Sequence, residues 1–135
     1  MKKVFVSYDH SEDVLYKYLL QAWDANTEFD FEFDQRSPNK PINSIEASVI
    51  QAALTKKMKE SDYILVIIGK KSHTSKWMKW EIERAKQHDT NLKFAAIKIH
   101  AVNVNPAGLP SNTAIAQGFE LSKIVSALNN AKMAI

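Results

Sequence analysis

The sequence predicts a single α/β domain built on an open, doubly wound parallel sheet. Its 135 residues match the commonest size of one hydrophobic core. Segments with strand patterns alternate with segments of helical period, which is typical of parallel sheets covered by helices. Residues 63–68 form a continuous, β-branched-rich apolar run, as expected for a strand buried on both faces. We therefore expect one flavodoxin-like domain over residues 1–135 with strand order 2-1-3-4-5.

The first half of the chain supplies a strand, a helix and an edge strand. Residues 3–8 predict the first strand, and Ser11 is expected to cap the following helix. Phenylalanines alternate with acids over residues 29–34, so one face of this second strand is buried and the other is acidic. Such a strand belongs at a sheet edge. Apolar residues of the helix recur at helical spacing, namely Leu15, Tyr18, Leu19, Ala22 and Trp23.

The second half continues the alternation. A proline-bearing loop over residues 35–43 leads to a second helix opened by Ser44, and a third helix runs from Ser75 to about residue 88. Residues 94–99 predict the fourth strand, and residues 102–104 a short fifth one. The expected buried stripes are Ile45, Val49, Ala52, Ala53 and Met58 in the second helix, Met78, Ile82 and Ala85 in the third, and Leu121, Ile124, Val125 and Leu128 in a C-terminal helix.

Composition excludes several classes of protein. The absence of cysteine rules out disulfides and thiolate metal sites. A net charge of +3, spread along the chain, does not indicate nucleic-acid binding. The longest apolar run is too short for a membrane span, and no signal-peptide apolar region follows the first residues, so a cytoplasmic protein is expected. The four histidines lack paired ligand spacing, which predicts no metal site.

Motifs of other α/β proteins are missing. Three glycines cannot form the Gly-x-Gly-x-x-Gly turn of dinucleotide-binding folds. Ile68-Gly69 ends the third predicted strand, where a phospho-acceptor domain would need an aspartate. Ligands of such sheets bind beyond the carboxyl ends of the strands. The loops at 7–11, 34–44 and 69–77 are therefore the places to look for a site.

The helix expected to begin after Ser75 carries the most unusual acid. Glu81 lies beyond its first turn, so neither the helix dipole nor a capping box explains it. Trp77 lies four residues earlier on the same helix face. Two interpretations stay open at this point. Trp77 and Glu81 form one wall of a ligand site, or Trp77 is a core anchor and Glu81 a surface acid paired with Arg84 or Lys79.

Four segments together resemble a TIR domain. They are Phe5-Val6-Ser7-Tyr8, Phe33-Asp34 before the proline-bearing loop, Ser61-Asp62 before the apolar strand, and Ser75-Lys76-Trp77-Met78-Lys79-Trp80-Glu81. Their order and spacing match from residue 3 to about residue 88, and the last segment is the most specific. Within that superfamily the chain is most similar to the TIR-like proteins of bacterial Thoeris antiphage systems.

This resemblance implies an enzyme that cleaves NAD at the nicotinamide-ribose bond, with NAD as substrate and no cofactor or metal. Glu81 occupies the position of the catalytic glutamate. Trp77 would pack on the nicotinamide or ribose, while Ser7, Tyr8 and His10 would line the floor of the site. Asp34 is also assigned to the site, and Arg36 and Ser37 would close their loop over the ligand. Asp9-His10 departs from the arginine-rich pair of some active TIR enzymes, which weakens the expected phosphate contacts.

The resemblance also implies a signalling role. The product would be a cyclic or conjugated ADP-ribose signal for a separate effector protein, and activation would involve self-association or a phage-derived component. Two alternatives remain. The domain is a catalytically silent interaction module, or it is a nucleoside N-glycosidase or deoxyribosyltransferase that also relies on a glutamate.

Overall fold

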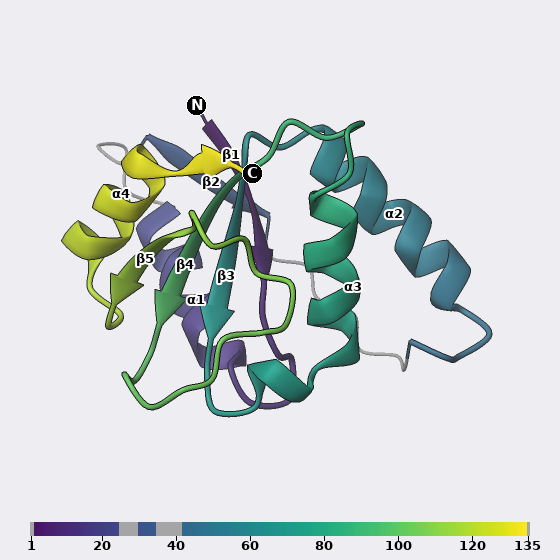
Figure 1. Ribbon diagram of the computed structural model, residues 1–135, viewed down its shortest axis with the longest axis horizontal. Helices are drawn as coiled ribbons and strands as arrows, with labels where there is room; N and C mark the ends of the chain where they lie inside the picture. Colours follow the sequence, from purple (N-terminus) through teal and green to yellow (C-terminus); the bar gives the residue numbers. More distant parts are fainter. Residues whose placement is uncertain (1, 25–29, 35–41, 135) are drawn as a thin grey trace.

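The computed structural model describes residues 2–24, 30–34 and 42–134 and confirms the predicted sheet (Figure 1). Five strands lie in the order β2-β1-β3-β4-β5, and all their pairings are parallel. The strands are β1 (Lys2–Ser7), β2 (Phe31–Asp34), β3 (Tyr63–Ile68), β4 (Lys93–Lys98) and β5 (Ala114–Gln117). A two-residue strand that was not predicted, β6 (Lys132–Met133), pairs antiparallel with the start of β4.

Helices cover the sheet on both faces and divide the core in two. Helices α1 (Val14–Asp24) and α4 (Leu121–Asn130) pack on one face, and α2 (Ala47–Lys59) and α3 (Lys76–Ala85) on the other (Figure 1). Every residue of β3 is buried, as its continuous apolar run predicts. β2 lies at the edge with Phe31 and Phe33 buried and Glu32 exposed, which confirms the predicted alternation.

The predicted start of the first helix is wrong, and of its predicted buried stripe only Trp23 turns inward. Ser11 donates its hydroxyl to Asp9 Oδ1 at 2.7 Å instead of capping, and α1 begins at Val14. Leu15, Tyr18 and Leu19 are exposed, and so is Ala22. Tyr16 and Leu20 take the other inward positions. Tyr16 and the predicted Trp23 pack against Phe119 at ring distances of 4.9 and 5.0 Å, and Leu20 enters the core.

The stripe predicted for the second helix is also wrong, because that helix begins at Ala47 and not at Ser44. Ile45 and Val49 are exposed, as are Ala52 and Ala53. The buried residues are Ala47, Leu54 and Met58, with Ile50 partly buried beside them. Of the predicted set only Met58 lies in the core. In α4, Ile124 and Leu128 are buried as predicted, Val125 is partly buried, and Leu121 is exposed.

The fifth strand begins at residue 114 and not at the predicted residue 102. Val102 and Val104 are exposed, because residues 100–103 form a turn in which Asn103 Oδ1 accepts from the backbone N–H of His100 at 3.0 Å. The strand is Ala114–Gln117 instead. The connection over residues 99–113 contains no helix, and Leu109 from it packs against the core on the α3 side of the sheet.

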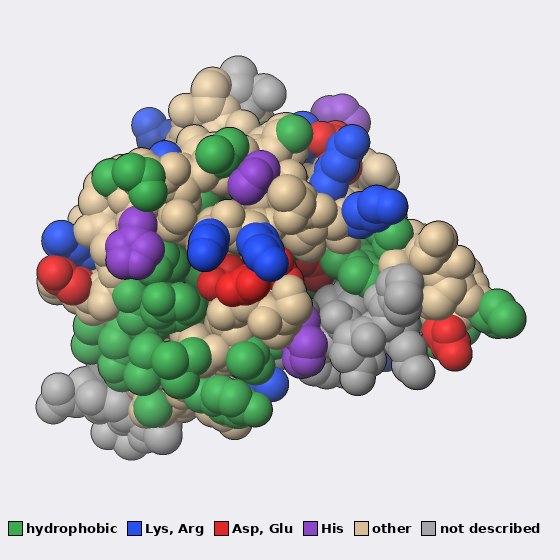
Figure 2. Space-filling model, turned by 90° about the horizontal axis from the view of Figure 1, so that it is seen from below, with side chains coloured by type: hydrophobic (Ala, Val, Ile, Leu, Met, Phe, Trp, Pro, Cys, Tyr) green, Lys and Arg blue, Asp and Glu red, His purple; other side chains and the backbone are tan. Residues whose placement is uncertain are grey.

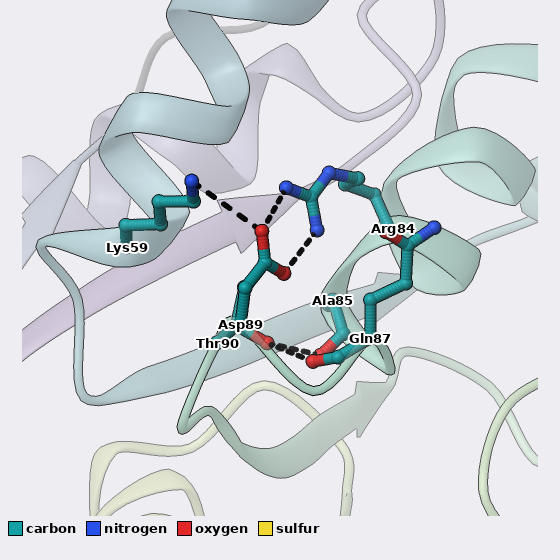
Figure 3. Close-up of polar contacts among 6 residues, drawn as sticks. All are labelled: Lys59, Arg84, Ala85, Gln87, Asp89 and Thr90. Carbon is teal, nitrogen blue, oxygen red and sulfur yellow. Dashed lines mark hydrogen bonds and ion pairs between the residues drawn. The ribbon is translucent and has the colours of Figure 1, made fainter.

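Helix α3 ends at Ala85, three residues earlier than predicted, and an ion-pair cluster stabilises its end (Figure 3). Both oxygens of Asp89 accept from Arg84 at 2.6 Å, and Lys59 from the end of α2 lies 3.4 Å from the same carboxylate. The Arg84 guanidinium holds the pKa of Asp89 well below its usual range. The hydroxyl of Thr90 donates to the carbonyls of Ala85 and Gln87. The cluster therefore ties the ends of α2 and α3 together.

Charged groups and histidines gather near the middle of the face on which the strands end (Figure 2). This view looks from below in Figure 1, toward the carboxyl ends of β3, β4 and β5. It is the face on which ligands of doubly wound sheets bind. None of the helices in the described part of the chain has the length and apolar character needed to cross a membrane.

Candidate active site

Glu81 and Ser7 form a buried polar pair where β1 ends. The hydroxyl of Ser7 donates to Oε1 of Glu81 at 2.7 Å, and the two residues are 0% and 1% exposed. Ser7 is the last residue of β1 and pairs with Val66 of the central strand. The tertiary fold therefore joins residues that are 74 positions apart in the sequence.

Helix α3 delivers Glu81 to this position because of where it begins. Ser75 Oγ accepts from the backbone N–H of Met78 at 3.2 Å, which confirms Ser75 as the N-cap. This start fixes the phase of the helix. Glu81 consequently shares the inward face with Met78, Ile82 and Ala85, all of which are buried.

Burial raises the pKa of Glu81 to about 8, and the hydrogen bond from Ser7 lowers it by a smaller amount. The carboxyl group is therefore mostly protonated at neutral pH. The interpretation of Glu81 as a surface acid is wrong, since Arg84 pairs with Asp89 and Glu81 is enclosed.

Trp77 lies one turn before Glu81 and is partly buried against the core on the α3 face. Its ring meets that of Trp80 edge-on, with centroids 5.8 Å apart. The indole thus has one part in the core and one part accessible. The buried part of Trp77 fits the interpretation as a core anchor, and its exposed part is available to contact a ligand.

The loop after β1 separates two residues predicted to line one floor. Tyr8 is 3% exposed and belongs to the core on the α1 face. His10 is exposed, and its ring lies 6.4 Å from that of Tyr8. Asp34 is the last residue of β2 and pairs with Phe5 through the backbone. The Asp34 side chain, Arg36 and Ser37 lie outside the described residues.

A second buried carboxyl was missed by the sequence analysis. Asp13 is 4% exposed directly before α1, and its Oδ2 has no hydrogen-bond partner within the described residues. Burial raises its pKa to about 6, with smaller contributions from the negative charges of Asp9 and Glu12. An acid just before a helix is typical of a solvated cap, so the sequence carries no signal of this burial.

Other charged groups lie in the loops that follow β1 and β3. Lys71, in the loop after β3, lies 3.2 Å from Glu12 in the loop after β1. His10, His73, His88 and His100 are all exposed. Within the described ranges no group of three or more histidine or acidic side chains is arranged to hold a metal ion.

The family model described as Thoeris protein ThsB, TIR-like domain, matches residues 5–104. The chain belongs to this family. The match includes Ser7, Trp77 and Glu81 and confirms the resemblance predicted from the sequence. It ends before β5 and α4, so the last part of this TIR-like domain lies outside the matched range.

Solved structures add a more distant likeness. The TIR domains of the activated Roq1 resistosome directly recognizing the pathogen effector XopQ are similar to this TIR-like domain with a TM-score of 0.44 and 14% sequence identity. The comparison covers 96% of this chain and 69% of the other. No curated protein shows significant similarity to the sequence.

Proposed function

We propose that this TIR-like domain cleaves NAD at the bond between nicotinamide and ribose, with Glu81 as the catalytic residue. The observation that carries the proposal is the buried Ser7–Glu81 pair at the carboxyl end of β1. A carboxyl group enclosed in a core loses hydration free energy. Perturbed carboxyls of this kind concentrate at functional sites.

The chemistry suits a single carboxylate. Departure of nicotinamide breaks the glycosidic bond and leaves an oxocarbenium-like ribose, whose positive charge a carboxylate stabilises. The bound nicotinamide ring of NAD is itself cationic, and a nearby cation lowers the pKa of a carboxyl group. Substrate binding would thus convert Glu81 from the protonated form to the reactive carboxylate. The released proton would pass to solvent.

Because Glu81 is enclosed, activation of the enzyme would have to expose it. At 1% exposure its carboxyl meets a substrate only after the groups that cover it move aside. We propose that self-association or a phage-derived component favours the open arrangement. The product would be a cyclic or conjugated ADP-ribose that signals to a separate effector protein in bacterial antiphage defence.

Nicotinamide release from NAD tests the proposal. We expect activated wild-type protein to release nicotinamide and Glu81→Gln, which keeps the shape of the side chain, to release none. Glu83→Gln is the matched control, because Glu83 is an exposed acid two residues along the same helix. Equal release by wild type and Glu81→Gln would sink the proposal. Mass spectrometry of the remaining ADP-ribose moiety distinguishes cyclic, linear and conjugated products.

A catalytically silent interaction module is the second candidate, because a Glu81 that no movement exposes would not meet a substrate. In that case Glu81 and Ser7 would be a structural pair only. The assay must therefore include conditions that promote assembly, such as high protein concentration and lysate of phage-infected cells. Nucleosides in place of NAD test the nucleoside N-glycosidase alternative in the same format.

A further inference from the structure

The carboxyl group of Asp13 occupies the space that a Cβ atom would need at Gly69, between the loops that flank the candidate site. A Cβ atom added at Gly69 would lie 2.6 Å from Cγ of Asp13 and closer still to both carboxylate oxygens. Atoms without a bond between them do not approach so closely, so any side chain at position 69 would require the Asp13 carboxyl group to move. The Asp13 side chain is thus seated directly on the backbone at the end of β3.

Ser72 extends the contact along the loop after β3. Its Oγ accepts from the backbone N–H of Gly69 at 2.8 Å and lies 2.9 Å from the carbonyl of Ile67, to which it donates. A hydrogen bond from Ser72 also lowers the pKa of Asp13. Since a hydroxyl has one proton, Ile67 and Asp13 compete for it. The buried Oδ2 of Asp13 is left without a partner within the described residues.

The contact spans two segments that hold the Ser7–Glu81 pair. Asp13 follows the loop that begins after Ser7, and its backbone N–H donates to the carbonyl of Asp9 at 2.8 Å. Gly69 begins the loop that continues through η1 (Ser72–Thr74) to the cap of α3, the helix that carries Glu81. The exposed Glu12–Lys71 pair joins the same loops nearby.

We propose that Asp13 is a positioning residue for Glu81, because its carboxyl group, seated on Gly69, fixes the start of α3 against the end of β1 so that Glu81 meets Ser7. An effect of Asp13 on the reaction rate rests on the proposed function, whereas its effect on the position of Glu81 does not. A buried carboxylate oxygen without a partner, such as Oδ2 of Asp13, costs free energy. A side chain that served packing alone would not carry this cost.

The first readout is the titration of Glu81, followed by NMR of its labelled side-chain carboxyl carbon. We expect Asp13→Ala to lower the pKa of Glu81 by about one unit or more, because a loosened loop lets water reach it. Asp13→Asn keeps the shape and should retain a pKa near that of wild type. Glu46→Gln is the matched control, since Glu46 also directly precedes a helix but is exposed and makes no cap hydrogen bond.

The second readout is the rate of nicotinamide release. We expect Asp13→Ala to lower kcat roughly 10- to 100-fold with little change in KM, because misplacing a catalytic group affects the reaction more than binding. Asp13→Asn should restore most of kcat. A wild-type protein inactive under all conditions would contradict the proposed function, while the titration of Glu81 would still decide the role of Asp13.

Gly69→Ala provides an independent test. The added methyl group should displace Asp13 and shift the Glu81 titration in the same direction as Asp13→Ala. The double variant Gly69→Ala/Asp13→Ala should be less destabilised than the sum of the single variants, because the methyl group enters the space that the carboxyl leaves. If Asp13→Ala does not fold, the Glu81 titrations of Gly69→Ala and of the double variant test the proposal in its place. Natively folded variants with a wild-type Glu81 titration would overturn the proposal.

Discussion

The hydroxyl of Ser7 donates a 2.7 Å hydrogen bond to Oε1 of Glu81, and neither side chain is accessible to solvent. A carboxyl group in this setting is held largely in its protonated form, since burial raises its pKa to about 8.

Glu81→Gln should stabilise the protein increasingly as the pH rises. The pKa of Glu81 is 4.5 unfolded and about 8 folded, so the folded state binds more protons between these values and wild-type stability falls across this window. Glutamine does not titrate. The gain over wild type should be small near about pH 5 and largest above about pH 8, at most on the order of 5 kcal/mol.

Thermal or urea unfolding of both proteins across this range provides the measurement. Asp13 has a pKa raised to about 6 and also makes stability fall with pH, but it is present in both proteins and cancels in the difference. A constant difference between wild type and Glu81→Gln from acid to alkaline pH would show that the pKa of Glu81 is not raised in the folded state.

Ser7→Ala should shift the pH dependence of nicotinamide release toward alkaline pH. The Ser7 hydroxyl lowers the pKa of Glu81, so its loss leaves the carboxyl protonated to a higher pH. The protein should also lose about 1 to 2 kcal/mol of stability, because one buried hydrogen bond is lost. Ser122→Ala, at an exposed site on α4, is the control. An unshifted pH profile would mean that Ser7 does not act on Glu81.

Trp77→Ala should abolish most nicotinamide release, whereas Trp80→Ala should retain it. Both indoles are partly buried and contact one another at 5.8 Å, so the two substitutions remove comparable packing. Only Trp77 lies one helical turn before Glu81, where a stacked ring would contact the ligand. Equal losses in the two variants, matched by equal losses in melting temperature, would assign Trp77 a packing role alone.

Asp89→Asn should lower the melting temperature at neutral pH and leave nicotinamide release unchanged. The pKa of Asp89 is lowered by Arg84 and Lys59, so its stabilisation is present above the usual carboxyl pKa and is lost in acid. The difference from wild type should therefore shrink toward about pH 3 and in high salt. Glu120→Gln, which removes an exposed pair with Lys123 at 3.5 Å, should change melting far less.

Periodic patterns identified most elements of the fold. β3 was predictable because both its faces are buried, and α3 because Ser75 caps it and Met78, Ile82 and Ala85 mark its inner face. The inward faces of α1 and α2 were not predicted correctly. Each helix carries two apolar stripes, and the sheet beneath selects one of them. Strand β5 at 114–117 follows an irregular connection over residues 99–113, and such a connection has no periodic signature that would place the strand after it.

By itself the sequence determined the strand order and the family, because these depend on local periodicity and on short motifs along the chain, and it singled out Glu81 as the candidate catalytic residue. The tertiary structure decided that Glu81 is enclosed, that Ser7 is its partner and that Asp13 is buried on Gly69. The protonation of Glu81 follows from these contacts. Hydration of a carboxyl group depends on everything that surrounds it in space, and residues far apart in the chain supply those surroundings.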